Sequence, residues 1–240
     1  MALTGVIVNC IGIIIGTVFG LFFNKIRECF KETIMAGVGL TVILLGLSMG
    51  LTSDRVLVIL ISLLIGAVIG EAMDLDEKLN RLGAHLEVRF KRGGSQSNIA
   101  EGFVTASLIF CVGALAVIGP LDSGIDGNHE ILYTKAVLDG FTALILTTTL
   151  GIGVVFSIVP LFLYQGSIAL FATQIERFIP EQFFNLFIDD MTATGGLLIV
   201  AIGLNLLYIT RIRVANLLPS LVVVGFVLYI YLQAGSWFSF

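Results

Sequence analysis

The sequence predicts an all-α membrane protein, a polytopic bundle of about eight transmembrane helices, and two observations carry this prediction. The first is composition, since 57% of the 240 residues are hydrophobic and 12% are charged, against roughly 45–50% and about 25% in soluble domains. The second is charge placement, because ten of the thirteen Lys and Arg residues flank long apolar runs, as in cytoplasmic loops. They form three clusters: Lys25, Arg27 and Lys31; Lys78, Arg81, Arg89, Lys91 and Arg92; and Arg211 and Arg213.

Helices that cross a bilayer need about 20 mostly apolar residues. The segment 136–174 is too long for one such span and just long enough for two, with a break at Gly151 and Gly153, because glycine lowers helix propensity. Six other runs have the required length: 3–23, 34–51, 55–71, 102–119, 190–208 and 214–234.

The positive-inside rule chooses between seven and eight spans. With one span in 136–174, Arg211 and Arg213 lie outside; with two, all three basic clusters lie inside. Eight spans with both termini outside therefore fit better. The only basic residues of the outer loops are then Arg55, Lys135 and Arg177.

Two further segments are expected to lie on the membrane surface. Residues 75–90 place leucines at helical spacing with basic residues on other faces, which predicts an amphipathic helix at the inner surface. The polar link 91–97 follows it. Residues 178–187 predict a short interfacial helix opened by Pro180.

An internal repeat is the main feature of the domain organisation. Residues 36–47 read AGVGLTVILLGL and residues 193–204 read ATGGLLIVAIGL, and five identical positions recur at an offset of 157. Inverted repeats are typical of secondary transporters, although Gly- and Leu-rich helices also resemble one another by composition alone. The predicted organisation is one membrane domain over 1–240, with a first repeat 3–71, a cytoplasmic helix and link 72–100, linking spans 101–152 and a second, inverted repeat 153–234.

Polar side chains within the apolar runs are the candidate site, because a charge in hydrocarbon costs at least about 2.5–3.5 kcal/mol and faces a cavity or a partner. Asp139 and Asp190 are the leading candidates, each as a cation ligand or a proton carrier, although Asp190 also suits helix N-capping. Amide and hydroxyl oxygens beside a carboxylate suit a hard cation, whereas Ser and Thr also bond to their own helix. The candidates of this second kind are Asn9, Thr148, Gln165, Thr194 and Asn205.

Breaks in membrane helices are tolerated where the freed backbone lines a cavity or is buried in protein. Gly151, Gly153 and Pro160 mark 147–160 as the expected broken helix, since proline removes a helix hydrogen bond.

Other chemistry has little support. Cys10, Cys29 and Cys111 have no CxxC spacing, and the two histidines lie in separate predicted loops, so we predict no cofactor and no enzyme activity, and leave the metal open. An intramembrane enzyme would require Asp139 and Asp190 to converge. No face carries the dense basic stripe of a nucleic-acid-binding protein.

Several motifs recur together along the chain: Asn9 with Gly12 and Gly16, Leu138-Asp139-Gly140, Tyr164-Gln165-Gly166-Ser167, Thr192-Ala193-Thr194-Gly195-Gly196 and Asn216-Leu217-Leu218-Pro219. In combination, and over essentially the whole chain, they resemble the bacterial membrane family catalogued as domain of unknown function 554. The resemblance implies a multi-pass protein of the bacterial plasma membrane. It brings no substrate and no catalytic residue.

The function favoured by these patterns is a small secondary transporter or ion-conducting protein for an unknown small solute or ion. We expect cation or proton coupling at Asp139, contact with the lipid bilayer and a homo-oligomer, because so small a bundle leaves little room for a buried pathway. The alternative is a non-transporting membrane subunit or sensor that acts through a protein partner. A paired Asp139 without a polar cavity would favour that alternative.

Overall fold

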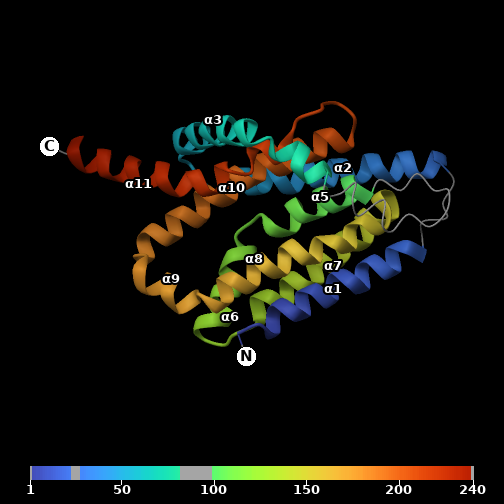
Figure 1. Cartoon of the computed structure of the whole chain (residues 1–240), viewed down its shortest axis with the longest axis horizontal. Helices are drawn as coiled ribbons and strands as arrows, with labels where there is room; N and C mark the ends of the chain where they lie inside the picture. The colour runs from blue at the N-terminus through green and yellow to red at the C-terminus, as the bar shows by residue number, and fades with distance from the viewer. Residues whose placement is uncertain (1, 23–27, 82–98, 239–240) are drawn as a thin grey trace. The chain divides into compact units, whose positions relative to one another are not determined.

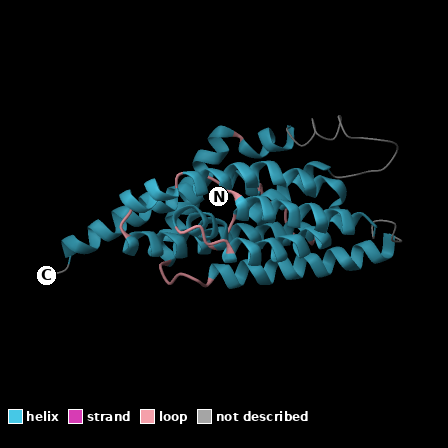
Figure 2. Ribbon diagram, turned by 90° about the horizontal axis from the view of Figure 1, so that it is seen from below, coloured by secondary structure: helices cyan, strands magenta, loops and turns pink. Residues whose placement is uncertain are grey.

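The computed structural model describes residues 2–22, 28–81 and 99–238, and every regular element in these ranges is helical (Figures 1 and 2). By length and composition, six helical segments of the described part can cross a membrane, or up to seven if the bent pair of α5 (Ile99–Cys111) and α6 (Leu115–Ile125) counts as one. The predicted class, an all-α polytopic membrane bundle, is therefore confirmed.

The chain divides into two compact units, and each unit joins two distant segments of the sequence. The first unit comprises Met1–Val38 and Leu79–Ile179, and the second comprises Gly39–Lys78 and Pro180–Phe240. The long helix α2 (Glu28–Gly50) contributes residues to both units. Long-range packing, rather than sequence order, therefore builds each core.

The remaining helices fall within one unit or the other. Those of the first unit, besides α5 and α6, are α1 (Thr4–Phe22), α7 (Glu130–Leu150), the 3-10 helix η1 (Gly151–Ser157), α8 (Ile158–Leu170) and α9 (Ala172–Phe178). Those of the second unit are α3 (Val56–Met73), α10 (Glu181–Leu206), the 3-10 helix η2 (Val214–Leu217) and α11 (Ser220–Phe238). Of the predicted amphipathic helix 75–90, residues 75–81 are helical. The rest of it and the predicted link 91–97 lie outside the described residues.

In the first unit, α1 and α7 run parallel and their backbones touch at glycines. Gly12 faces the carbonyl of Ala136, and one turn later Gly16 faces the carbonyl of Gly140, so closely that a Cβ on Gly16 would collide with it. Lipid supplies no hydrophobic drive between membrane helices, so small residues that permit close packing replace it. The glycines of α1, spaced at four, are thus the seam that fixes α1 on α7.

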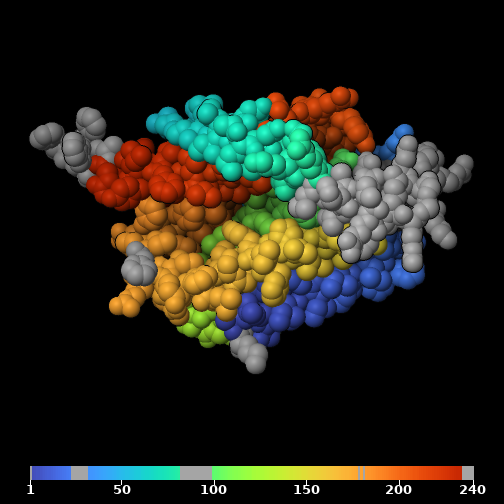
Figure 3. Space-filling view, viewed as in Figure 1, coloured from blue at the N-terminus to red at the C-terminus, as the bar shows by residue number. Residues whose placement is uncertain are grey.

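The long apolar segment from α7 to α8 folds back on itself. Asn9 Nδ2 lies 3.0 Å from Asp139 Oδ2 and 3.2 Å from Gln165 Oε1, whereas a straight helix would separate Asp139 from Gln165 by about 39 Å. The reversal follows Leu150, where Gly151 has φ +71°, a region that favours glycine. In the space-filling view, α8 (gold) lies against α1 (blue) (Figure 3).

The predicted single span 102–119 is wrong in its geometry. Two shorter helices, α5 and α6, meet there at an angle of 59°. The break is at Gly113, which has φ +116°, a backbone conformation that a residue with a Cβ rarely adopts. An uninterrupted apolar run concealed this break, because Gly113 is one small residue among many.

In the second unit, the predicted boundary between residues 178–187 and 190–208 is also wrong. The predicted interfacial helix 178–187 and the predicted span 190–208 form one continuous helix, α10, whose first residue follows Pro180. Pro180 is the N-cap of α10, so its missing N–H removes no hydrogen bond of that helix, and no further proline interrupts α10. Likewise Pro219 directly precedes α11 and does not interrupt it.

Within the second unit, α2 and α10 cross in opposite directions at four glycines. A Cβ on Gly46 would lie 2.6 Å from the carbonyl oxygen of Gly196, and a Cβ on Gly196 would lie 2.6 Å from that of Gly46. Further along, Gly39 and Gly203 face each other in the same reciprocal way. The two segments that match in sequence are therefore in direct contact.

Candidate functional site

A buried polar cluster lies among α1, α7 and α8 of the first unit. Lys135 Nζ lies 2.5 Å from Asp139 Oδ2, and Asn9 Nδ2 donates to the same carboxylate oxygen and to Gln165 Oε1. Lys135 and Asp139 are 5% and 7% exposed, and Asn9 and Gln165 are fully buried. Three of the predicted site residues, Asn9, Asp139 and Gln165, are thus brought together from distant parts of the chain.

The cluster lies midway along the helix that carries its charges. Asp139 is the tenth of the 21 residues of α7, so it is about 15 Å from either end, half the thickness of a hydrocarbon core of about 30 Å. The helix that carries Asp139 starts earlier than the predicted segment 136–174, because α7 begins at Glu130.

Lys135 is the site residue that the sequence reasoning missed. It was assigned to an outer loop, whereas it lies inside α7 with its side chain on Asp139. The signal was the spacing of four residues between a cation and an anion, which places both on one helix face.

Each element of the site follows from a local feature of the sequence. The glycine seam holds α1 close enough to α7 for the short side chain of Asn9 to reach Asp139. The turn at Gly151 returns the chain so that Gln165 reaches Asn9. The site therefore depends on backbone features outside it as much as on its own side chains.

The cluster is neutral in charge but incompletely hydrogen-bonded. Within the described part of the chain, Asn9 Oδ1 and Gln165 Nε2 are buried and have no hydrogen-bond partner. Most buried polar atoms in proteins are paired, so one unpaired acceptor and one unpaired donor on two neighbouring side chains stand out. These atoms are available to a water molecule or to a polar ligand.

A cation held by Asp139 in the manner of a metal site is not supported by this geometry. The ammonium group of Lys135 already occupies the position next to the carboxylate. Among the described residues, no three His, Cys, Asp or Glu side chains gather in a way that suits a metal ion.

Asp190 forms a separate cluster in the second unit. Arg55 Nε lies 3.0 Å from both carboxylate oxygens, Ser53 Oγ donates to Oδ1 at 2.5 Å, and Arg55 Nη2 donates to the carbonyl of Leu186 at 3.1 Å. Asp190 is fully buried. The N-capping alternative for Asp190 is wrong, because α10 begins nine residues earlier at Glu181. The cluster fastens the connection between α2 and α3 to α10.

The other predicted site residues make local contacts. Thr148 Oγ1 donates to the carbonyl of Ile145, and Thr194 Oγ1 donates to that of Asp190. Pro160 lies in the first turn of α8, and the break itself is the 3-10 helix from Gly151 to Ser157, with Gly153 packed on the backbone of Ile99.

Asn205 closes the loop that follows α10. Its Nδ2 donates to the carbonyl of Ile212, and its Oδ1 accepts from Thr210 Oγ1 and from the N–H of Ile212. A groove of about 490 Å³ lies along this loop, with Asp76 on its rim. Asn205 is therefore a loop-forming residue with all its polar groups engaged.

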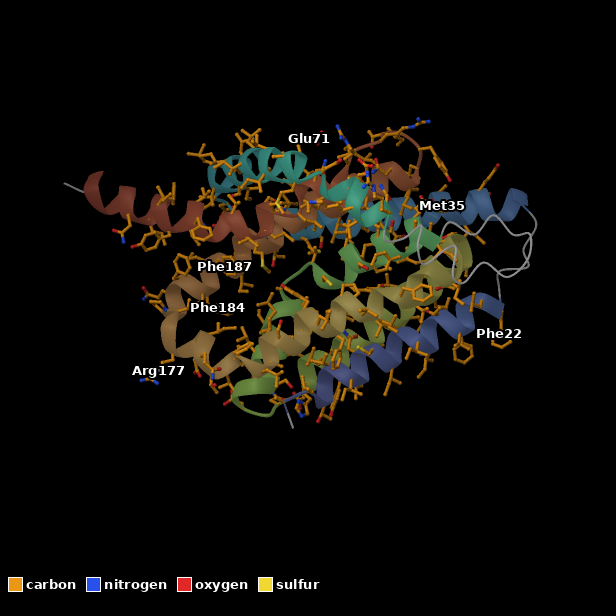
Figure 4. The ribbon with its side chains drawn as sticks, in the orientation of Figure 1. Phe22, Met35, Glu71, Arg177, Phe184 and Phe187 are labelled. Carbon is orange, nitrogen blue, oxygen red and sulfur yellow. The ribbon has the colours of Figure 1, made fainter. Side chains whose placement is uncertain are left out.

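A third polar cluster joins α3 to η2. Glu71, labelled in Figure 4, accepts from Arg213 at 2.7 Å and from Asn216 Nδ2 at 2.6 Å, and the backbones of Gly70 and Asn216 are in contact. Both side chains of the Glu71–Arg213 pair are more than half exposed. The pair thus lies in contact with water rather than in the hydrophobic core.

Comparison with known proteins gives consistent results over most of the chain. The chain is 34% identical over 232 residues to the "Uncharacterized membrane protein YdfK" of Bacillus subtilis (strain 168), covering 94% of this chain and 96% of that protein. It is 27% identical over 221 residues to the "Uncharacterized protein YqgA" of Escherichia coli (strain K12), covering 90% and 92%. No solved structure matches it. The sequence model described as "Protein of unknown function (DUF554)" matches residues 4–229, and the chain therefore belongs to this family of membrane proteins.

Proposed function

We propose that the protein is a small secondary transporter of the bacterial plasma membrane, in which the Lys135–Asp139 pair is the ion-sensitive part of the solute site. The observation that carries the proposal is a buried ion pair midway along a membrane helix, next to two buried amide atoms without partners. Ionisable groups inside membrane helices mark ion, proton or substrate pathways.

Energetics argue against a purely structural pair. Replacing a buried ion pair by well-packed apolar residues is often neutral or stabilising. Each polar atom left unpaired in the interior costs about 1–3 kcal/mol. A cluster kept only for stability would therefore be apolar or fully paired, whereas Asn9 Oδ1 and Gln165 Nε2 are neither.

The directions of packed helices support eight crossings, an even number that places both termini on the same side, and the placement of the basic clusters makes that side the outer one. α2 and α10 run in opposite directions. If 136–174 crossed once, α10 would be the sixth span and would run in the same direction as α2, the second. With two crossings there, and with α5 and α6 as one broken span, α10 is the seventh span and the directions agree.

The same contact supports an inverted repeat. The offset of 157 carries Gly39 to Gly196 and Gly46 to Gly203. The contact between Gly39 and Gly203 becomes, when the two copies are exchanged, the contact between Gly196 and Gly46, which is present. A two-fold axis between two copies generates such self-complementary contacts, and inverted repeats underlie alternating access in many transporters.

The second candidate function is a non-transporting membrane subunit or sensor that acts through a protein partner. The observation that favours it is the pairing of Asp139 with Lys135, since a paired carboxylate needs no ligand. We expect a homo-oligomer in either case, and light scattering of the purified protein in detergent checks it.

A melting experiment separates the two functions. Wild type and the double variant Lys135→Met/Asp139→Leu are heated in detergent with Na⁺, K⁺, Ca²⁺, different pH values and a panel of small solutes, with Thr148→Val as the control. A ligand at about 100 times its Kd stabilises the folded state by roughly 2.7 kcal/mol. A stabilisation present in wild type and control but absent in the double variant supports transport, and flux of that ligand into liposomes completes the test. No stabilisation in any condition would favour the subunit.

A further inference from the structure

The break between α5 and α6 is level with the Lys135–Asp139 pair. The short connection 126–129 makes α6 and α7 antiparallel, and Gly119 of α6 packs on Leu132 of α7. Four residues back along α6 lead to its first residue, Leu115, with Gly113 two residues before it, and seven residues forward along α7 lead to Asp139, about 10 Å away. Consistent with this, the charges of Lys135 and Asp139 both act on the thiol of Cys111, the last residue of α5.

The backbone at this break has unpaired donors. The N–H groups of Gly113, Ala114 and Leu115 form no hydrogen bond with any described residue, and no side chain caps α6. These N–H groups open an 11-residue helix, whose N-terminus carries partial positive charge. Backbone N–H groups at a helix start favour an anion.

A second, independent feature that points to a ligand is found on α8. Gln165 and Ala169 are buried four residues apart on α8, and Gly124 of α6 packs on Ala169 and on Ala172, the first residue of α9. Gln165 therefore lies on the side of α8 that faces α6, one turn deeper. Its Nε2 is fully buried and has no partner, so it is a spare hydrogen-bond donor.

We propose that this place binds a small monovalent anion together with a proton: the anion contacts Lys135, Gln165 Nε2 and the N-terminus of α6, while the proton is on Asp139. This inference rests on the proposed transport function and names its substrate class. The ligand is small because the groups around it are almost fully buried.

The binding of the proton and the binding of the anion are coupled because charges must balance inside the hydrocarbon core. One ammonium group needs one counter-charge in a low-dielectric interior. Without ligand, the counter-charge is the carboxylate of Asp139. When Asp139 takes up a proton, Lys135 becomes free to pair with an anion, so proton and anion bind as a neutral couple and neither binds well alone.

Among the residues that the structure describes, few other titratable groups face this place. On the elements packed around Asp139 they are the thiols of Cys10 on α1 and Cys111 on α5, and the phenol of Tyr164 on α8, which interacts with Cys111. Thiols and phenols ordinarily titrate above neutral pH. The proton that is coupled to the anion is therefore assigned to Asp139.

The test uses the full chain in liposomes that contain a pH-sensitive dye, with the membrane potential clamped at zero by K⁺ and valinomycin. The probes are sodium chloride, nitrate and methanesulfonate, whose conjugate acids are too strong to cross a bilayer as neutral molecules. An inward gradient of at least one anion should acidify the lumen. Asp139→Asn, a neutral mimic of the protonated state, should admit the anion without a proton, and therefore create a current instead of acidification.

Binding gives a second signature that does not require flux. In wild type, the apparent affinity for the anion, measured from its effect on melting, should fall about tenfold per pH unit once Asp139 is mostly ionised, because proton and anion are linked. In Asp139→Asn the affinity should not depend on pH. Gln165→Glu leaves the ion pair intact and places a negative charge beside the anion, so it should abolish binding even if Asp139→Asn fails to fold.

The outcomes distinguish the two levels of the proposal. Acidification driven by a Na⁺ or K⁺ gradient, or transport of a neutral or cationic solute alone, would agree with the proposed transport function and contradict the proposed anion substrate. Anion affinity that ignores pH in wild type, or that survives Gln165→Glu, also overturns it. No flux of any probe and no binding by correctly folded protein would overturn both.

Discussion

The two units each contain a buried carboxylate with a cationic partner, and they use it differently. In the first unit, Asp139 pairs with Lys135 of its own helix, about 15 Å from either helix end. In the second unit, Asp190 pairs with Arg55 from another helix connection, and the Arg55 side chain is 22% exposed. The first pair lies beside unpaired amide atoms, whereas Asp190 is bonded to Arg55 and Ser53.

This difference indicates that the Arg55–Asp190 pair holds helices together, whereas the Lys135–Asp139 pair is available for ligand binding. The Arg55–Asp190 pair joins elements far apart in the sequence, and arginine supplies the fork that suits a carboxylate. The Lys135–Asp139 pair joins two residues four apart in one helix, so it adds nothing to the tertiary fold by itself. We infer that the second unit uses charge for assembly and the first keeps it for function.

Removing Asp139 alone should have the largest effect on stability. Asp139→Ala leaves Lys135 buried without a counter-charge, and we expect a loss of about 3–5 kcal/mol in the free energy of unfolding. The double variant Lys135→Met/Asp139→Leu should recover most of it. Unfolding titrations in mixed micelles measure both, and a double variant as unstable as the single one would sink the view that the pair serves function rather than fold.

Removing Asp190 should cost less, because Arg55 can reach water. For Asp190→Ala we expect a loss of roughly 1.5–3 kcal/mol, the range for hydrogen bonds to charged groups. Arg213→Ala is the matched control, since it breaks a pair whose side chains are more than half exposed, leaves the bond from Asn216 to Glu71 in place and should cost at most about 1 kcal/mol. Equal losses from the two variants would contradict the role of Asp190 as a fastening.

The glycine seam between α1 and α7 offers a third test, of how far helix packing supports stability and the site. Gly16→Ala places a Cβ against the carbonyl of Gly140, and the forced separation should destabilise by about 1–3 kcal/mol. Gly166→Ala is the control, because its Cβ would meet only Leu3 at an ordinary 3.6 Å. The seam should also weaken the site, since Asn9 depends on it. If Gly16→Ala left the melting temperature and ligand binding unchanged, the site would not depend on the seam.

The smallest expected effect is at the end of α3. Asp74 is exposed, and a hydrogen bond with the acidic side chain of Glu77 raises the pKa of Asp74. A carboxyl with a raised pKa in the folded state contributes stability at low pH that is lost as pH rises through that pKa. Asp74→Asn, which also tolerates the local φ of +50°, should therefore raise the Tm slightly at pH 7 and leave it unchanged near pH 4. A lower Tm at pH 7 would mean that ionised Asp74 is stabilising.

Part of this picture was predictable from the sequence. Asn9, Asp139 and Gln165 were identified as site candidates because each is a polar residue in an apolar run, and membrane burial is expensive for such groups. That reasoning could not identify their partners. Lys135 was predicted in an outer loop because charge alone marks the edge of a span, and only tertiary packing shows that its charge lies inside a helix. Arg55 does lie in the connection between α2 and α3, but the sequence did not show that it pairs with Asp190.

Of the two helix breaks, one could be predicted from the sequence and the other could not. The reversal at Gly151 falls within the expected 147–160 region, where two glycines, a hydroxyl run and an excess of length coincide. The break at Gly113 had no comparable signal, since its neighbours form an ordinary apolar run of suitable length. A positive φ is a property of the packed backbone, and in a sequence with 27 glycines no single one is distinguished.

The spacing of Lys135 and Asp139 also bears on how the chain enters the membrane during synthesis. A lone Lys or Asp at the centre of a nascent span opposes insertion by about 2.5–3.5 kcal/mol. Four residues apart, the two charges neutralise each other as soon as one helical turn has formed. The segment therefore carries its own counter-ion through the insertion machinery and reaches the bilayer before α8, which supplies Gln165, has been synthesised.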